Sequence, residues 1–286
     1  MTRTPPPSPR SRPVVTTPLV RASQLAHFAA LLIVFVRPDL WALLLGLLVG
    51  NHALLMSQGL WPKSRSLGPN RLGFDATTTT VALTFDDGPE PGPTQEVLEL
   101  LRATDHRATF FLIGERARRY PELVRRIVEE GHELANHTES HPYWFCIYPP
   151  WMLRREVESC QQFLTTFATV RWFRAPAGLR NVFLERTLAL CGLHLATWTH
   201  RGFDTARGDA ERVLGDLSRD LEPGSVLLLH DAGSAQTAEG RPVTLAVLPE
   251  LLEELEIRGL RSVTLSDALA SETSASASPV GPAAPA

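Results

Sequence analysis

Hydrophobic and polar positions form a repeating pattern over residues 77–270 that predicts strands alternating with helices. Short apolar runs typical of buried strands occupy residues 81–85, 108–112, 133–135, 172–174, 194–197, 226–229 and 261–264. Amphipathic stretches with helical spacing lie between them, over residues 94–101, 121–130, 152–167, 182–190, 210–221 and 244–258. This alternation predicts an α/β fold with a parallel sheet covered by helices, either an open doubly wound sheet or a barrel. Seven strands favour an incomplete barrel related to the (β/α)8 plan.

Residues 22–60 carry a different pattern, which predicts one or two membrane-associated helices. The chain is apolar over residues 22–36 and 40–56, and Arg37-Pro38-Asp39 interrupts it. A single span would place two charges near the middle of the bilayer, at about 2.5–3.5 kcal/mol each. A hairpin places them at a turn, although an arm of about 22 Å is shorter than a hydrocarbon core of about 30 Å. A buried pair of soluble helices fits the near absence of a polar face less well. We favour the hairpin.

The flanks of this segment bear on location. Both are basic, as expected for a hairpin with its two ends on the cytoplasmic side, whereas a single span would place the large domain outside. We expect the inner membrane of a bacterium and leave the side of the domain open. No A-x-A site follows the first apolar run, which disfavours a removable signal peptide. We also expect a disordered basic arm over 1–21, a linker over 61–76, a catalytic domain over 77–270 and a disordered tail over 271–286.

Composition narrows the function classes. The chain has 286 residues, 44% hydrophobic and 21% charged, as in a folded globular protein. Its formal net charge of -3 gives no electrostatic footprint of nucleic-acid binding, so no nucleic-acid partner is expected. Three cysteines without CxxC spacing argue against a disulfide framework and a thiolate zinc site. A metal would therefore need other ligands, and the sequence indicates no protein partner.

Two pairs of polar residues follow predicted strands. Asp86 and Asp87 come directly after residues 81–85, and adjacent carboxylates need a cation, a hydrogen-bonding partner or a shared proton. His137 and His141 follow residues 133–135 at a spacing that puts both on one face of a helical turn, as chelation of one ion requires. One aspartate with two histidines would leave open positions for water and substrate. A helix cap and ordinary surface histidines are the structural alternatives.

Two further strands end on residues that could serve chemistry. Arg174 ends residues 172–174 and would keep a neighbouring carboxylate ionised, unless it makes a plain surface ion pair. His230 follows residues 226–229 and could serve chemistry, unless it is only a core or helix-capping histidine. Function in α/β folds gathers at the carboxyl ends of strands, which places these groups at one edge.

Together, four motifs resemble the signature motifs of polysaccharide deacetylases in order and spacing. They read TFDDGP at 84–89, HTESH at 137–141, RAPAG at 174–178 and LLLHD at 227–231. This is the NodB-homology, or carbohydrate esterase family 4, domain, and the resemblance covers residues 81–265. It implies a distorted (β/α)7 barrel and metal-dependent hydrolysis of N-acetyl groups on amino sugars.

Matched position by position, the resemblance implies a role for each residue. The ligands of a divalent metal, by default Zn²⁺, would be Asp87, His137 and His141. Asp86 would be the catalytic base and His230 the general acid.

Further residues would support these. Arg174 would hold the base, Asp204 would pair with the acid histidine, and the backbone N–H of Ala177 would donate to the oxyanion. Leu228 resembles the residue that lines the acyl pocket. Residues 198–205 depart from the family pattern: they begin with Trp198, taken as a substrate residue, and end with a threonine where the family usually has tryptophan. The shape of the acceptor site is therefore open.

Three functions are consistent with these residues. The first is removal of N-acetyl groups from a cell-envelope polysaccharide. The second is deacylation or deformylation of a lipid-linked amino sugar at the membrane, and the third is a non-catalytic carbohydrate-binding relic. The expected partners are an N-acylated glycan or lipid-linked amino sugar, and the membrane.

Overall fold

The structure, a computed structural model, describes residues 11–75 and 79–276. The chain forms two compact units, each assembled from separate segments. Unit 1 comprises Met1–Leu72, Phe111–Arg119 and Ala135–Thr197, and unit 2 comprises Gly73–Phe110, Tyr120–Leu134 and Trp198–Ala286. Of the predicted arm, linker and tail, residues 1–10, 76–78 and 277–286 lie outside the described residues. The predicted domain boundaries stay a prediction.

Eight strands form one sheet, and every strand pairing described between them is parallel. The strands are β1 (Thr80–Asp86), β2 (Ala108–Leu112), β3 (Glu133–Asn136), β4 (Trp172–Phe173), β5 (His194–Leu195), β6 (His200–Arg201), β7 (Val226–His230) and β8 (Arg261–Ser262). Their order is β5-β4-β3-β2-β1-β7-β6, with β8 paired to β1. The α/β class and the parallel sheet are confirmed.

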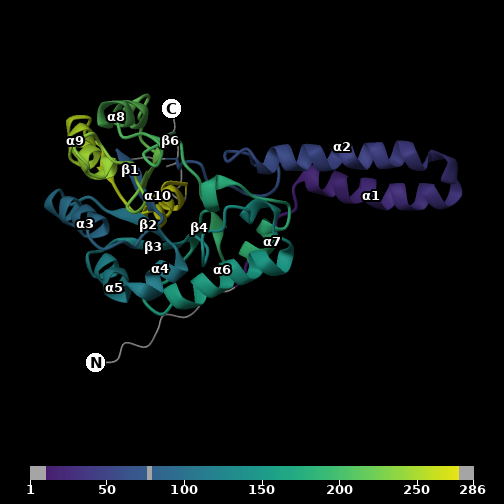
Figure 1. The fold of residues 1–286 in the computed structure, drawn as a ribbon, viewed down its shortest axis with the longest axis horizontal. Coiled ribbons are helices and arrows are strands. Elements are labelled where there is room, and N and C mark those ends of the chain that lie inside the picture. Colours follow the sequence, from purple (N-terminus) through teal and green to yellow (C-terminus); the bar gives the residue numbers. More distant parts are fainter. Residues whose placement is uncertain (1–10, 76–78, 277–286) are drawn as a thin grey trace, which may run out of the picture. The chain divides into compact units, whose positions relative to one another are not determined.

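The core of unit 2 is built on β1 and β7. The two strands run in register from Ala82 opposite Val226 to Asp86 opposite His230. Both are buried along their length, which explains why they read as continuous apolar runs. The helices of this unit are α3 (Pro93–Ala103), α5 (Pro121–Glu129), α8 (Ala210–Ser218), α9 (Val243–Ile257) and α10 (Leu265–Ser276). Helix α9 packs on α3 and α8, and α10 packs on β1 (Figure 1).

The globular part of unit 1 packs three helices around β4 and its neighbours. These are α4 (Gly114–Arg119), α6 (Pro150–Leu164) and α7 (Leu184–Leu190), and the 3-10 turns η2 (Phe145–Ile147) and η3 (Pro176–Gly178) lie in the loops. Helix α6 contacts both α4 and α7 (Figure 1). Strand β4 pairs with β3 and β5, and this brings the loops after β3 and β4 to the same edge.

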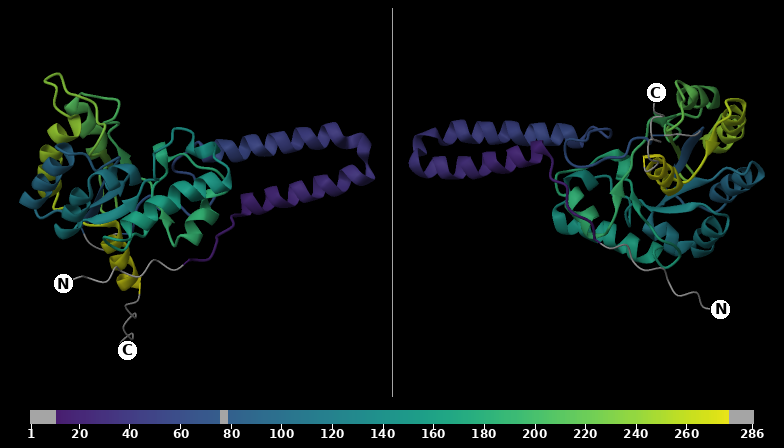
Figure 2. Two further views of the ribbon diagram at one scale, coloured as in Figure 1. Left: turned by 60° about the horizontal axis from the view of Figure 1, so that its bottom comes forward. Right: turned by 180° about the vertical axis from the view of Figure 1, so that it is seen from behind.

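Two long apolar helices of unit 1 form a hairpin. They are α1 (Pro18–Val36) and α2 (Trp41–Gly59), joined by the 3-10 turn η1 (Pro38–Leu40). Figure 2 shows them side by side and antiparallel, reaching away from the rest of the unit. Asn51 donates to the Ser23 hydroxyl at 2.8 Å between the helices, and Arg37 pairs with Asp39 at the turn. By length and composition alone, each helix could cross a membrane.

The boundaries of the predicted helices follow the predicted ranges closely, but α10 (Leu265–Ser276), which extends past residue 271 into the predicted tail, was not predicted. Two short elements were not predicted either. Strand β6 has two polar residues and no apolar run, and α4 is a six-residue helix rich in charge. Pattern analysis has no signal for either, because both depend on neighbouring elements for their partners.

We predict that one buried histidine makes unit 2 sensitive to acid. His132 is 6% exposed, accepts a hydrogen bond at Nδ1 from the Ala108 N–H at 3.3 Å, and lies against Phe110. Burial, helped by Arg107, lowers the pKa of His132 to about 4. The unfolded chain therefore binds more protons below about pH 6.5, so stability of about 3 kcal/mol present above that pH is lost as the pH falls towards 4. In urea titrations, His132→Gln should flatten this pH dependence, and an unchanged slope would contradict the assignment.

Candidate active site

The carboxyl end of β1 carries a cluster of acidic groups in unit 2. Asp86 is buried at the last position of β1, opposite His230 on β7. Asp87 has a φ of 74°, which turns the chain sharply after the strand. Asp231 lies behind this turn and accepts a hydrogen bond from the Thr94 hydroxyl at 2.6 Å. Burial raises the pKa of Asp231 to about 7, although the hydrogen bond from Thr94 lowers it. The nearby negative charges of Asp87 and Asp86 also raise it.

Gly88 makes this turn possible. A Cβ atom at position 88 would lie 2.2 Å from Oδ2 of Asp231, a separation that no side chain tolerates. The chain therefore needs glycine here for close approach. The DDGP sequence thus packs its two aspartates against a third, buried carboxyl group.

A second feature of unit 2 is the pair formed by Asp204 and His230. Asp204 is fully buried and accepts from the Nδ1 of His230 at 2.8 Å, from the backbone N–H of His230 at 2.7 Å and from the Thr244 hydroxyl at 2.8 Å. Burial opposes the charged imidazole, but Asp204, followed by Asp86 and Asp87, raises the pKa of His230 to about 9. His230 is therefore positively charged and able to donate a proton at neutral pH, and the hydrogen bond from its Nδ1 to Asp204 fixes the orientation of the ring.

In unit 1, His137 and His141 lie together after β3. Their ring centroids are 4.9 Å apart. Nδ1 of His137 lies 2.8 Å from the carbonyl oxygen of Arg174, and because a carbonyl can only accept, Nδ1 carries the proton. Nε2 of His137 is then the atom with a lone pair, the arrangement typical of metal-binding histidines.

The Arg174 side chain is fully buried in unit 1. Its guanidinium stacks on the ring of Phe111 at 4.0 Å, and it donates to the carbonyl oxygens of Ala196 and Thr197. A buried guanidinium fixed by carbonyls and a π face is rigid, so it can hold a carboxylate in one orientation. The surface ion-pair alternative for Arg174 is wrong, because the side chain has no exposed area.

Backbone strain gathers at the predicted motifs. Seven described non-glycine residues have a positive φ, and five of them are Asp87, Thr138, His141, Ala177 and Phe203. Non-glycine residues in this region are strained and persist where surrounding structure holds them, often at functional sites. These conformations could not be predicted, because none of the five is glycine, and Thr138, Ala177 and Phe203 are of residue types that rarely adopt a positive φ.

The remaining predicted residues have varied surroundings. Leu228 and Trp198 are buried at 2% and 5% exposure, and Ala177 is exposed in the turn η3. The guanidinium of Arg201 lies over the Trp198 ring at 5.4 Å. Sequence analysis missed Thr244 and Thr94, whose hydroxyls donate to the buried carboxylates of Asp204 and Asp231, respectively. Their position in the first turns of α9 and α3 was the only signal in the sequence.

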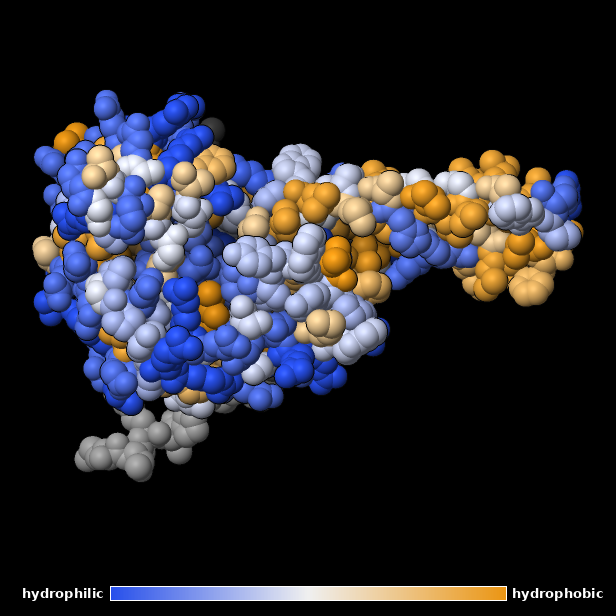
Figure 3. Space-filling view, viewed as in Figure 1, coloured by the Kyte–Doolittle hydropathy of each residue, from blue (hydrophilic) through white to orange (hydrophobic). Residues whose placement is uncertain are grey.

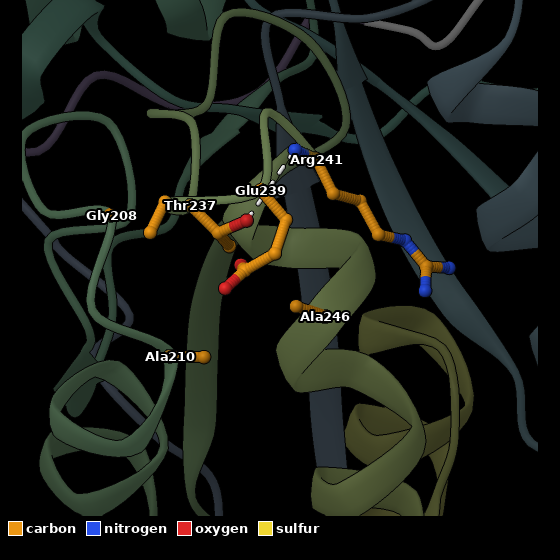
Figure 4. Close-up of a pocket in the computed structure, with 7 residues that line it drawn as sticks. Gly208, Ala210, Thr237, Glu239, Arg241 and Ala246 are labelled. Carbon is orange, nitrogen blue, oxygen red and sulfur yellow. Dashed lines mark hydrogen bonds between the residues drawn. The ribbon is translucent and has the colours of Figure 1, made fainter.

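A shallow pocket of unit 2 lies elsewhere. Figure 4 shows Gly208, Thr237, Glu239 and Arg241 around it, near the N-terminal ends of α8 and α9. No predicted site residue lines this pocket. It therefore has no part in the candidate chemistry.

Comparison with known proteins agrees with the motifs. Residues 75–196 match the family model described as polysaccharide deacetylase. A peptidoglycan-N-acetylglucosamine deacetylase of Bacillus cereus is 35% identical over 191 residues, 66% of this chain and 87% of that protein. A chitooligosaccharide deacetylase of Bradyrhizobium sp. (strain ANU 289) is 37% identical over 193 residues, 64% of this chain and 87% of that protein.

Solved structures agree with the fold. A family 4 carbohydrate esterase from Streptomyces lividans, in complex with acetate, superposes with a TM-score of 0.58 and 34% identity, over 65% of this chain and 93% of that one. The predicted NodB-type fold, a curled parallel half-barrel, is confirmed by this likeness. The chain therefore belongs to the polysaccharide deacetylase family and is a hydrolase of carbon–nitrogen bonds other than peptide bonds.

Proposed function

We propose that this protein is a metal-dependent deacetylase that removes N-acetyl groups from amino sugars of a bacterial cell-envelope polysaccharide. The observation that carries the proposal is the paired histidines of unit 1. Their rings lie 4.9 Å apart, and the carbonyl of Arg174 accepts from Nδ1 of His137, which orients this ring. A histidine oriented through Nδ1 beside a second imidazole suits a shared metal ion.

The donor set fits a divalent metal. Asp87, His137 and His141 are a group of side chains in the described chain that could each offer one ligand atom to an ion. One carboxylate and two neutral imidazoles suit Zn²⁺ and leave open positions, as catalytic sites require. When bound, the ion supplies a Lewis acid that polarises the acyl oxygen and makes water more acidic.

The chain's own residues perform the proton transfers. Asp86 accepts the proton of the attacking water, and Arg174 keeps this carboxylate ionised and oriented. His230, held protonated by Asp204, donates its proton to the nitrogen of the departing amine. General acid and base groups of this kind contribute about 10²- to 10⁴-fold each.

Three residues shape the acyl and sugar subsites in this proposal. The backbone N–H of Ala177, in a strained turn with φ 52°, donates to the oxygen that gains negative charge. A donor of this kind is worth about 3 kcal/mol. Leu228 and Trp198 supply apolar walls, and the C–H face of a sugar ring packs well on such surfaces.

The substrate class and the location follow from the relatives and the hairpin. The two relatives described above are named for peptidoglycan N-acetylglucosamine and for chitooligosaccharides, so we propose an N-acetylglucosamine-containing glycan. The hairpin formed by α1 and α2 would anchor the protein in the bacterial inner membrane, because its helices are of membrane length and mostly exposed.

Acetate release tests the proposal. The full chain in lipid nanodiscs should release acetate from N-acetylchitooligosaccharides or peptidoglycan, lose activity on chelation and regain it with added Zn²⁺. His141→Ala should lose more than about 100-fold, because substitutions of residues that only orient a ligand already cost about 10- to 100-fold. His52→Ala, on the hairpin, is the matched control and should keep full activity.

Two results would contradict the proposal. Acetate release that chelation does not affect would remove the metal from the mechanism. A zinc-loaded chain that binds these glycans and releases no acetate would instead indicate a carbohydrate-binding relic.

A further inference from the structure

Unit 1 exposes several large aromatic and aliphatic side chains of a kind that a water-facing surface rarely carries. Tyr143 is 91% exposed, Trp151 72%, Trp144 70% and Ile147 61%. We call these four residues together with Trp61 and Phe183 the aromatic surface. Tyr143 follows the predicted ligand His141 by two residues, so the surface begins directly beside the candidate site.

Hydrogen bonds connect this surface to the base of the hairpin. The carbonyl oxygen of Gly59, the last residue of α2, accepts from the backbone N–H of Arg180 at 3.0 Å. The next residue, Asn181, donates through Nδ2 to the carbonyl oxygen of Tyr148 at 2.9 Å, and its Oδ1 accepts from the Phe183 N–H. Trp61 follows α2 by two residues. Trp61, Ile147 and Phe183 of the aromatic surface are therefore connected, through short chain segments and these hydrogen bonds, to the point where the hairpin joins the unit.

The hairpin itself is apolar on its outside. Leu25, Phe28, Phe35, Trp41 and Leu47 are all more than half exposed. Figure 3 shows hydrophobic side chains gathering along the hairpin and continuing onto the body where the hairpin meets it. A bilayer that covers the hairpin down to its base reaches Trp61, two residues past the end of α2, and the exposed polar residues Arg21, Gln24 and Ser57 near that base lie at the same level.

We propose that the aromatic surface lies in the headgroup layer of the membrane that the hairpin enters. This inference rests on the membrane anchoring given under Proposed function. Tryptophan and tyrosine favour that layer, since their rings are apolar and their N–H and O–H groups reach water. Exposed Arg155, one helical turn after Trp151 on α6, and Arg65, four residues after Trp61, add charges that attract anionic lipids.

The composition of the surface favours lipid over glycan as its occupant. Ile147 and Phe183 offer no hydrogen-bonding group to sugar hydroxyls, and the tyrosine and the tryptophans of the surface carry the amphipathic rings that suit the headgroup layer. The consequence is that the loop after His141 and the segment after Ala177 both lie at the bilayer surface. The site would then act on glycan close to the membrane rather than on distant polymer.

A polarity-sensitive NBD fluorophore tests the contact in the full chain. In a Cys146→Ser, Cys191→Ser background, Ile147→Cys carries the label, and the chain is reconstituted in vesicles of phosphatidylcholine and phosphatidylglycerol. We expect blue-shifted NBD emission that headgroup-level doxyl lipid quenches. The matched control carries the label at Gln162→Cys, which is exposed near the far end of α6 and should give red, unquenched emission.

Alkaline carbonate extraction separates this inference from the anchor on which it depends. If the full chain is extracted by carbonate, the membrane anchor itself fails, and this inference fails with it. If the chain resists extraction and NBD at position 147 stays unquenched, only the inference is overturned. Unquenched emission that shifts when chitooligosaccharide is added would assign the surface to glycan instead. Substituting Tyr143, Trp144 and Trp151 by serine should abolish quenching at position 147 and leave extraction resistance unchanged.

Discussion

Asp86→Asn should abolish turnover and leave metal binding intact. Asp86 is buried at the end of β1, in register with His230, so the amide of the variant fits the same space. An amide oxygen cannot take up the proton of the attacking water at neutral pH, and the loss of a general base costs about 10²- to 10⁴-fold in rate. The measurement is kcat/KM for acetate release, together with the zinc content of the purified protein.

Asp220→Asn is the matched control for this substitution. Asp220 is exposed and lies two residues after the end of α8 in unit 2. It has a positive φ, which asparagine tolerates. It should keep both activity and zinc. Activity retained in Asp86→Asn would show that another group accepts the proton, and zinc lost from Asp86→Asn would make this residue a ligand.

Asp204→Asn should move the alkaline limit of activity to lower pH by about 1–3 units, the usual effect of one neighbouring opposite charge. In the native protein kcat should fall as the pH rises through about 9, where His230 loses the proton that it must donate. Without the Asp204 carboxylate, only the charges of Asp86 and Asp87 oppose burial, so the pKa of His230 falls from about 9. At pH 8, each unit by which this pKa lies below 8 removes about tenfold of the protonated form.

Thr244→Val provides a graded comparison. It removes one of the three hydrogen bonds to Asp204 and keeps the charge, so the alkaline limit should move in the same direction by a smaller amount. The full profile of kcat against pH distinguishes this effect from general damage, which lowers kcat at every pH equally. An Asp204→Asn profile with an unshifted alkaline limit would remove His230 from the role of acid.

The strand–helix alternation of the fold could be predicted because the buried strands of this parallel sheet are apolar runs bounded by polar loops. β1 and β7 are clear in the sequence for this reason. Strand β6 could not be predicted, since His200 and Arg201 become a strand only by pairing with Leu227 and Leu228 of β7. The residues of a short strand alone do not show which strand further along the chain it will pair with.

The candidate site residues could be picked out in the sequence only in part. Residues at strand ends, such as His137 and His230, stand out because polar groups interrupt apolar runs there. The contacts that hold the site residues in place cannot be recognised in the sequence. The Thr244 hydroxyl donates to Asp204, 40 residues away, and backbone carbonyls hold the Arg174 guanidinium. Backbone carbonyls occur at every residue, so sequence alone cannot say which of them a side chain will find.

The junction at Gly59 has a mechanical consequence. A Cβ atom there would lie 2.1 Å from the Arg180 carbonyl oxygen, so the two backbones are in direct contact and no side chain cushions them. Arg180 is three residues from Ala177 on the same short segment. The end of the hairpin is therefore joined backbone to backbone to the segment that carries the Ala177 turn, and we expect a tilt of the hairpin to displace that turn.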